Sequence, residues 1–345
     1  MKVCFTIQRP PHVHFYRAAI SELVEAGHEV SVFVRDSEIT TSLLDAYDID
    51  HTTLTNGPNG SVVDLAWTQA TFEARLIRQL RRLDPDVVSG VGGVSASHAA
   101  AAVGAESVVF TDTEHARLSN ALMKPFVDRV YTPDCFHQTF GNGHVRYPGY
   151  HELAYLHPNR FTPDSAVLEQ TDIDPERPLA VVRLAGWEAA HDVGANGIDD
   201  PTVVIERLEA AGAQVRLTSE APSGTIAPDR ELDLPPDQFH DLLAHATLYL
   251  GEGATTAAES AVLGTPAIYV NSLRMGYTDE LEARYQLLYN CQGSFRRERA
   301  IRTAERVLDG SEPTDFVAAR EEMLAEKVDT TDVIIRAITG GDTAS

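Results

Sequence analysis

Residues 248–270 read LYLGEGATTAAESAVLGTPAIYV, and this stretch sets the fold class. The apolar segment Leu248–Leu250 predicts a strand, and the glycine turn after it leads into a helix expected over Thr255–Leu263. Ala267–Val270 is apolar and β-branched, as expected of the next strand. A strand, a helix and a second strand in this order form the unit from which parallel sheets are built.

The same alternation runs through most of the chain in both directions. The expected strands are Val3–Ile7, Glu29–Val34, Asp86–Ser89, Ser107–Phe110, Arg129–Tyr131, Leu179–Leu184 and Gln214–Thr218. The expected helices are Phe15–Ala26, Thr40–Tyr47, Arg75–Leu83, Val94–Val103, Leu118–Phe126, Thr202–Ala211 and Pro236–His245. Such alternation predicts parallel sheets with helices on both faces.

The length of 345 residues fits two domains better than one. The alternation fails over 151–178, where proline and aspartate are frequent, so we expect a linker there. We predict an α/β fold with Rossmann-like domains at 1–150 and 179–310 that face each other across a cleft. The C-terminal helices, over 311–340, are expected to pack back across that cleft.

The formal net charge is −23, and Lys2, Lys124 and Lys327 are the only lysines. Nucleic acids and anionic membranes bind basic surfaces, so this composition argues against both as partners. An acid-rich, lysine-poor surface is expected of a halophilic protein, because concentrated salt screens the repulsion between like charges.

The amino-terminal sequence, MKVCFTIQRPP, lacks the long apolar core of a signal peptide. No segment reaches the roughly 18 apolar residues of a membrane-spanning helix, so we expect a cytoplasmic protein with no integral membrane segment. Cys4, Cys135 and Cys291 are scattered without zinc-ligand or redox-motif spacing and are expected to be small buried hydrophobic residues.

Ligands of open parallel sheets bind at the carboxyl ends of the strands, so the loop that begins at Gly251 is the first candidate site. The backbone amides at Gly253, with the hydroxyls of Thr255 and Thr256, suit a diphosphate at the start of a helix. Glu259 lies on the first turns of that helix and is expected to accept hydrogen bonds from a ribose diol. The alternative is an ordinary strand-to-helix turn with a solvated glutamate.

A second candidate loop follows the strand that ends at Leu184. Arg183 is expected to hold a diphosphate through its planar guanidinium. Trp187 is a candidate to cover a base or a sugar face, and His191 is a further polar candidate. The alternative is a long insertion without a role in binding.

The loop after the first strand, QRPPHVHF, offers His12 as a general base that deprotonates an acceptor hydroxyl. After Phe110 the segment TDTEHA brings Asp112 and Glu114 to a strand end, where either carboxylate is a candidate to orient His12. Capping or packing of the following helices explains both segments equally well.

Three Asp-x-Asp segments, over 48–50, 84–86 and 172–174, lie before strands or in the linker and are expected to be acidic turns. His12 and His14 have the spacing of a metal-binding pair but no evident third ligand. We expect no metal site and no resident cofactor.

The pattern G-x-G-x₅-E-x₄-G-x-P at 251–266 resembles the sugar-nucleotide signature of GT-B glycosyltransferases, which the non-hydrolysing UDP-N-acetylglucosamine 2-epimerases share. The segments PPHVHF, DTEHA, GYHELAYLHP, HDVG and GTPAI together resemble an archaeal and bacterial family of predicted glycosyltransferases catalogued as a domain of unknown function, DUF354. This resemblance covers almost the whole chain and implies a GT-B-like fold.

Two finer resemblances concern the candidate catalytic residues. His12 falls where MurG-like transferases carry the histidine of a G-G-H-x-x-P loop, although Pro10 and Pro11 replace the glycines. Glu114 is the nearest match to a His-x-Glu-Ala segment of the epimerases.

These observations favour a glycosyltransferase that moves a sugar from a nucleoside-diphosphate donor to a sugar or lipid-linked acceptor. The first alternative is a sugar-nucleotide 2-epimerase, which would use the same nucleotide site with acid–base groups at C2 of the sugar. The second is a non-catalytic protein that binds a sugar nucleotide.

Overall fold

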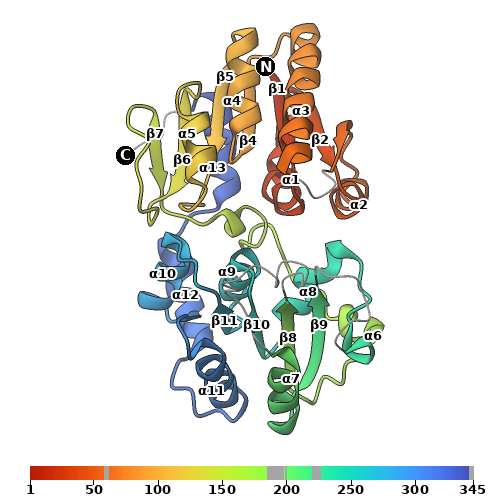
Figure 1. Ribbon diagram of the computed structural model, residues 1–345, viewed down its shortest axis with the longest axis vertical. Coiled ribbons are helices and arrows are strands. Elements are labelled where there is room, and N and C mark those ends of the chain that lie inside the picture. The colour runs from red at the N-terminus through yellow and green to blue at the C-terminus, as the bar shows by residue number, and fades with distance from the viewer. Residues whose placement is uncertain (58–61, 185–197, 199, 220–226, 342–345) are drawn as a thin grey trace. The chain divides into compact units, whose positions relative to one another are not determined.

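A computed structural model describes residues 1–57, 62–184, 198, 200–219 and 227–341 (Figure 1). The chain forms two compact units: unit 1 comprises Met1–Arg160 and Lys327–Ser345, and unit 2 comprises Phe161–Glu326. The segment expected as a linker, 151–178, is therefore divided between the two units. It contains a 3₁₀ helix, η1 (His151–Ala154), and the short helix α6 (Ala166–Gln170).

Within its described residues, unit 1 is built on a seven-stranded parallel sheet of order β3-β2-β1-β4-β5-β6-β7. The strands are β1 (Lys2–Ile7), β2 (Glu29–Asp36), β3 (Thr52–Asn56), β4 (Val87–Val91), β5 (Glu106–Phe110), β6 (Arg129–Pro133) and β7 (His144–Tyr147). The helices are α1 (Pro10–Glu25), α2 (Glu38–Ala46), α3 (Val62–Leu83), α4 (Val94–Val103), α5 (Arg117–Met123) and α13 (Thr330–Thr339).

The core of unit 1 lies on both faces of this sheet. Against one face, Phe72 and Leu76 of α3 pack with Ala96 of α4 and the strand residues Val88 and Val109. Helices α1 and α13 pack against each other, and α1 also contacts α2 and η1.

Unit 2 contains a five-stranded parallel sheet, of order β12-β11-β10-β8-β9, within the part of it that the structure describes. The strands are β8 (Leu179–Leu184), β9 (Gln214–Ser219), β10 (Leu248–Gly251), β11 (Ala267–Val270) and β12 (Leu288–Cys291). The helices are α6, α7 (Pro201–Ala210), α8 (Phe239–Ala244), α9 (Ala254–Leu263), α10 (Gly276–Ala283), α11 (Arg296–Leu308) and α12 (Phe316–Glu326), with the 3₁₀ turns η3 (Pro228–Arg230) and η4 (Pro236–Gln238). The two parallel sheets confirm the α/β class predicted from the alternation.

Three strands were not expected from the sequence: β3, β7 and β12. Each is the outermost strand at one side of its sheet. Edge strands are short and partly solvated, and β3 (TTLTN) buries only Leu54 and Thr55. The apolar signal of β3 and β7 is therefore weaker than that of the central strands, whereas β12 is a short strand of four residues that are mostly buried.

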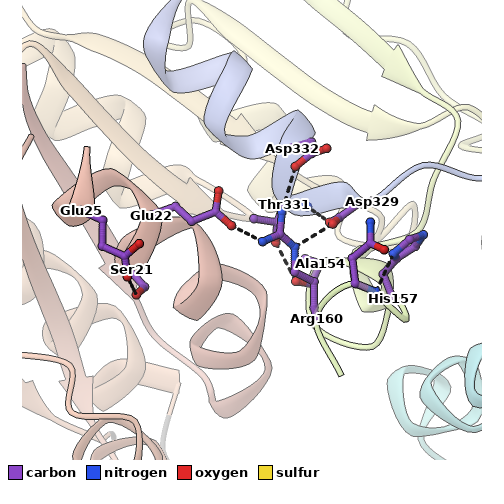
Figure 2. A network of polar contacts seen from close by, with 10 residues as sticks. Ser21, Glu22, Glu25, Ala154, His157, Arg160, Asp329, Thr331 and Asp332 are labelled. Carbon is purple, nitrogen blue, oxygen red and sulfur yellow. Dashed lines mark hydrogen bonds and ion pairs between the residues drawn. The ribbon is translucent and has the colours of Figure 1, made fainter. Parts of the chain in front are cut away.

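The returning C-terminal segment is attached to unit 1 through Arg160 (Figure 2). Arg160 contacts Asp329 at 2.7 Å and Asp332 at 2.9 Å, and it also pairs with Glu22 of α1. Arg160 is the last residue of unit 1 before the chain enters unit 2, and Asp329 comes just after its return. The guanidinium thus ties the outgoing and returning segments to the same helix.

The same attachment continues along the returning segment. Lys327 is nearly fully buried, lies 3.0 Å from Asp134 and sits over the ring of Tyr150. The hydroxyl of Thr330 donates to the carbonyl of Tyr150 at 2.7 Å. Helix α13 is therefore an integral part of unit 1, although it follows unit 2 in the sequence. None of the described helices has the length and apolarity needed to cross a membrane.

Candidate functional site

In unit 2, the sheet register brings two of the predicted residues together. Strands β8 and β10 are adjacent and parallel, and Gly251 pairs with Arg183 at their carboxyl ends. The amide of Glu252 donates to the carbonyl of Arg183 at 3.3 Å. Arg183 therefore leaves the sheet directly beside the glycine turn that precedes α9.

Gly251 is required by close packing beneath this turn. A Cβ atom at this position would lie 2.3 Å from the Tyr249 hydroxyl oxygen and 2.8 Å from the Arg183 carbonyl oxygen. Tyr249 is fully buried, and its hydroxyl lies 3.4 Å from the Gly253 carbonyl that accepts its hydrogen. The buried Tyr249 thus packs against the turn and forms a hydrogen bond with it, and sequence reasoning did not identify this residue.

Gly253 leaves the start of α9 accessible to the Arg183 side chain. A Cβ atom on Gly253 would lie 3.9 Å from Nε of Arg183, which is an ordinary contact distance. Gly253 is the N-cap residue and has no side chain with which to cap the amides of the first turn. Arg183 and these amides together provide positive electrostatic potential at one place.

The two threonines of the turn differ in environment. Thr255 is partly exposed, whereas Thr256 is buried and forms a hydrogen bond with Tyr249. Burial raises the pKa of Tyr249 well above its ordinary value, and the nearby charge of Arg183 opposes that rise. The hydroxyl of Tyr249 therefore stays protonated and able to donate.

Glu259 lies on the buried side of α9 and is 5% exposed. Its Oε1 is 3.0 Å from Nε2 of His240, which belongs to α8 and is also buried. A buried carboxylate needs hydrogen-bond partners, and the imidazole provides one and fixes the orientation of the carboxylate. The predicted ribose-binding residue is thus held in one orientation by a histidine. Trp187 and His191 lie outside the described residues.

In unit 1, His12 occupies the first turn of α1 and is partly buried. Its Nδ1 accepts the backbone N–H of Gln8 at 3.4 Å, so the neutral ring carries its proton on Nε2. Burial lowers the pKa of His12 to about 3, and the charges of Arg9, His151 and Arg35 add to this effect. The ring is therefore a neutral N–H donor at physiological pH.

Asp112 does not contact His12 within the described part of the chain, and its partner is His151 of η1. Oδ2 of Asp112 lies 3.3 Å from Nδ1 of His151, whose ring packs against Phe15. A carboxylate favours a proton on the nitrogen that faces it, so neutral His151 presents the lone pair of Nε2. This Nε2 is buried and has no hydrogen-bond partner among the described residues. Burial lowers the pKa of His151, and Asp112 opposes that shift.

Glu114 is directed toward a different part of unit 1. Its Oε1 accepts the backbone N–H of His137 at 3.2 Å, and its own carbonyl accepts from Gln138. Glu114 is nearly fully buried and supports the segment between β6 and β7. Of the two carboxylates proposed beside His12, Asp112 is thus the one that contacts a histidine, but this histidine is His151.

Sequence reasoning missed Tyr249, His240 and His151. The first two lie in apolar segments, where their polar groups gave no periodic signal. His151 is part of GYHELAYLHP, which the family resemblance includes, but it fell inside the expected linker. The resemblance of that segment to the family was the signal that could have identified His151.

Comparison with known proteins places this architecture in a family. A model of the family described as protein of unknown function (DUF354) matches residues 1–292. The chain belongs to this family. It is also similar to the uncharacterized protein MJ0665 of Methanocaldococcus jannaschii, with 22% identity over 289 residues that cover 78% of this chain and 81% of that protein.

Several solved structures share the fold of this family member. The S. aureus MnaA–UDP structure aligns with a TM-score of 0.71 and 12% identity, covering 98% of this chain and 96% of that one. Glycosyltransferase VinC in complex with dTDP aligns with a TM-score of 0.64 and 16% identity, covering 99% of this chain and 100% of that one. UDP-GlcNAc 2-epimerase from Neisseria meningitidis bound to UDP-GlcNAc aligns with a TM-score of 0.65 and 12% identity, covering 99% of this chain and 100% of that one. At these identities the similarity establishes a GT-B-like fold.

Proposed function

We propose that this protein is a glycosyltransferase that uses a nucleoside-diphosphate sugar as donor. The observation that carries the proposal is the placement of Arg183 beside Gly253 at the start of α9, with Glu259 in the second turn of that helix. Arg183 and the α9 amides suit the diphosphate, and Glu259, oriented by His240, suits the ribose. Solved structures of the same fold that carry UDP, dTDP or UDP-GlcNAc support this reading.

The acceptor is assigned to unit 1. The acceptor hydroxyl oxygen forms a bond to the anomeric carbon, and the bond from that carbon to the diphosphate oxygen breaks. The electron pair leaves with the diphosphate, where Arg183 and the α9 amides stabilise the negative charge. The hydroxyl proton moves to Nε2 of His151, which Asp112 orients, and His12 contacts the acceptor through its Nε2–H.

This chemistry requires no resident metal or cofactor, because Arg183 and the helix amides supply the positive charge at the leaving group. Turnover measured in the presence of EDTA should equal turnover without it. A loss of activity on chelation that added magnesium restores would contradict this part of the proposal.

The proposal is tested by incubating the full chain with UDP- and dTDP-sugars, with and without candidate acceptors. Release of nucleoside diphosphate only with an acceptor supports transfer. His151→Gln should lower kcat by about 100-fold or more, as expected for loss of a general base. His115→Gln removes an exposed histidine of the same unit and should leave kcat unchanged.

A 2-epimerase remains the second candidate, because the Asp112–His151 pair could also exchange a proton at C2 of a bound sugar and because an epimerase shares this fold. An epimerase would change the sugar nucleotide in the absence of any acceptor. A protein that binds the nucleotide without turnover under either condition would be a non-catalytic sensor, and His151→Gln would then have no effect.

A further inference from the structure

Two arginines lie side by side at the carboxyl edge of the unit 1 sheet, the edge at which its strands end. Strands β1 and β2 are adjacent and parallel, and Ile7 pairs with Val34. Arg35 follows Val34 directly, and Arg9 lies two residues after Ile7. Both side chains therefore leave the sheet at one place, next to the first turn of α1 that carries His12.

Arg35 is held in position by neutral groups. It donates to Oε1 of Gln69 at 2.5 Å, and Nε2 of Gln69 donates to the hydroxyl oxygen of Ser95 at 2.6 Å. Gln8, the residue after β1, donates to the same oxygen at 3.0 Å. This network joins the segment after β1 with β2, α3 and α4 and immobilises the guanidinium without neutralising its charge. Nε of Arg35 is buried and has no hydrogen-bond partner among the described residues.

The positive charge of this arginine pair is unusual because the chain as a whole is strongly acidic. Acidic residues outnumber basic ones 51 to 28, yet within the described residues neither Arg9 nor Arg35 contacts a carboxylate. Burial and the neighbouring Arg9 lower the pKa of Arg35 below its ordinary value. Two adjacent positive charges without a counter-ion favour an anion from solution.

We propose that Arg9, Arg35 and the Nε2–H of His12 bind an anionic group of the acceptor, a carboxylate or a phosphate. This inference rests on the proposed glycosyl transfer and names the acceptor class. Planar guanidinium groups bind the two oxygens of a carboxylate or phosphate in parallel, and a neutral imidazole N–H adds a third donor. An acceptor held in this way by its anion would present a hydroxyl to His151.

The bound anion has a consequence for His12. The charges that lower the pKa of His12 come from Arg9 at the N-cap of α1, from Arg35 on β2 and from His151 on η1, while Asp112 faces His151. An anion between the arginines and His12 offsets two of these charges, so the pKa of His12 rises when the acceptor binds.

Isothermal titration of the full chain with glucose 6-phosphate, glucuronate and glucose at fixed ionic strength tests the site. We expect the phosphate or the carboxylate sugar to bind at least about tenfold more tightly than glucose, because a charged hydrogen bond contributes more than a neutral one. The better of the two anionic sugars identifies the acceptor chemistry. Arg9→Gln should weaken that binding about tenfold. Arg78→Gln, an exposed arginine on α3, should leave it unchanged.

Equal affinity for the three sugars, or unchanged anion binding in Arg9→Gln, would overturn the proposal. It would also fall if Arg9→Gln weakened UDP binding instead, since the arginines would then hold the donor. Donor turnover separates this inference from the proposed function. Turnover without any preference for anionic acceptors refutes the anion site and retains transfer. If anion binding depends on Arg9 but no turnover is found, glycosyl transfer is refuted. The assignment of the bound anion to an acceptor is then refuted with it.

Discussion

The carboxyl edges of the two sheets differ in the chemical groups that form them. In unit 2 the described part of the edge includes the glycine turn at Gly251 and Gly253, with the charged residues Glu252 and Arg183 beside it. In unit 1 the corresponding edge is filled by side chains, among them Arg35 and His12. Under the proposed function, the glycine turn would hold the diphosphate that all donors share, and the side chains of unit 1 would discriminate among acceptors.

The units also differ in continuity. Unit 2 is a single stretch of chain, whereas unit 1 is completed by α13, which returns after Glu326 and is attached through Arg160. The stability of unit 1 therefore depends on contacts between segments that are far apart in sequence.

The largest expected effect comes from Arg160→Ala. Asp329 would remain almost fully buried without its arginine partner, and we expect unit 1 to lose about 3 kcal/mol. Hydrogen exchange measured by mass spectrometry should show reduced protection in α1 and α13 and unchanged protection in unit 2. Arg302→Ala, which breaks an exposed pair with Glu298, should cost about 0.5 kcal/mol or less. Equal effects of the two variants would contradict the attachment described for unit 1.

A smaller effect is expected from Gly251→Ala in unit 2. The added Cβ would lie far inside contact distance of Tyr249 and of the Arg183 carbonyl, so we expect a loss of about 2 kcal/mol in urea unfolding. Gly253→Ala is the matched control, because its Cβ would have ordinary contacts and should cost about 1 kcal/mol or less. A larger cost for Gly253→Ala than for Gly251→Ala would mean that the turn is not supported by Tyr249.

The smallest effect concerns the pH dependence of unit 1. The pKa of His12 is lowered to about 3 in the folded protein, below the ordinary value of 6.5. The unfolded chain therefore binds a proton that the folded chain does not, and stability falls as the pH decreases from 6.5 toward 3. His12→Gln should reduce this loss relative to the wild type in urea unfolding at several pH values. His115→Gln, at an exposed position, should show the wild-type slope. A steeper loss in His12→Gln would contradict a neutral, partly buried ring.

The sequence predicted the central strands and most of the helices because their apolar periodicity is strong, as in β1 and β10, but it did not predict α6 and α10. It did not reveal the edge strands β3 and β7, which carry few buried residues, or the short strand β12. For the site, Arg183 and Gly253 could be placed together because parallel strands end at one edge of a sheet. The contacts of His151 with Asp112 and of His240 with Glu259 depend on packing between separate elements, and no local pattern encodes them. The Arg9 and Arg35 pair escaped notice for the same reason, since the residues are 26 positions apart and meet only through the register of β1 and β2.

Equilibrium binding of UDP and dTDP to the wild type and to Arg183→Gln tests most directly whether unit 2 holds a nucleoside diphosphate. We predict that at least one nucleotide binds, that Arg183→Gln weakens it about tenfold, and that Arg302→Gln, an exposed arginine of the same unit, leaves it unchanged. Nucleotide affinity that is the same in all three proteins would contradict the assignment of this site.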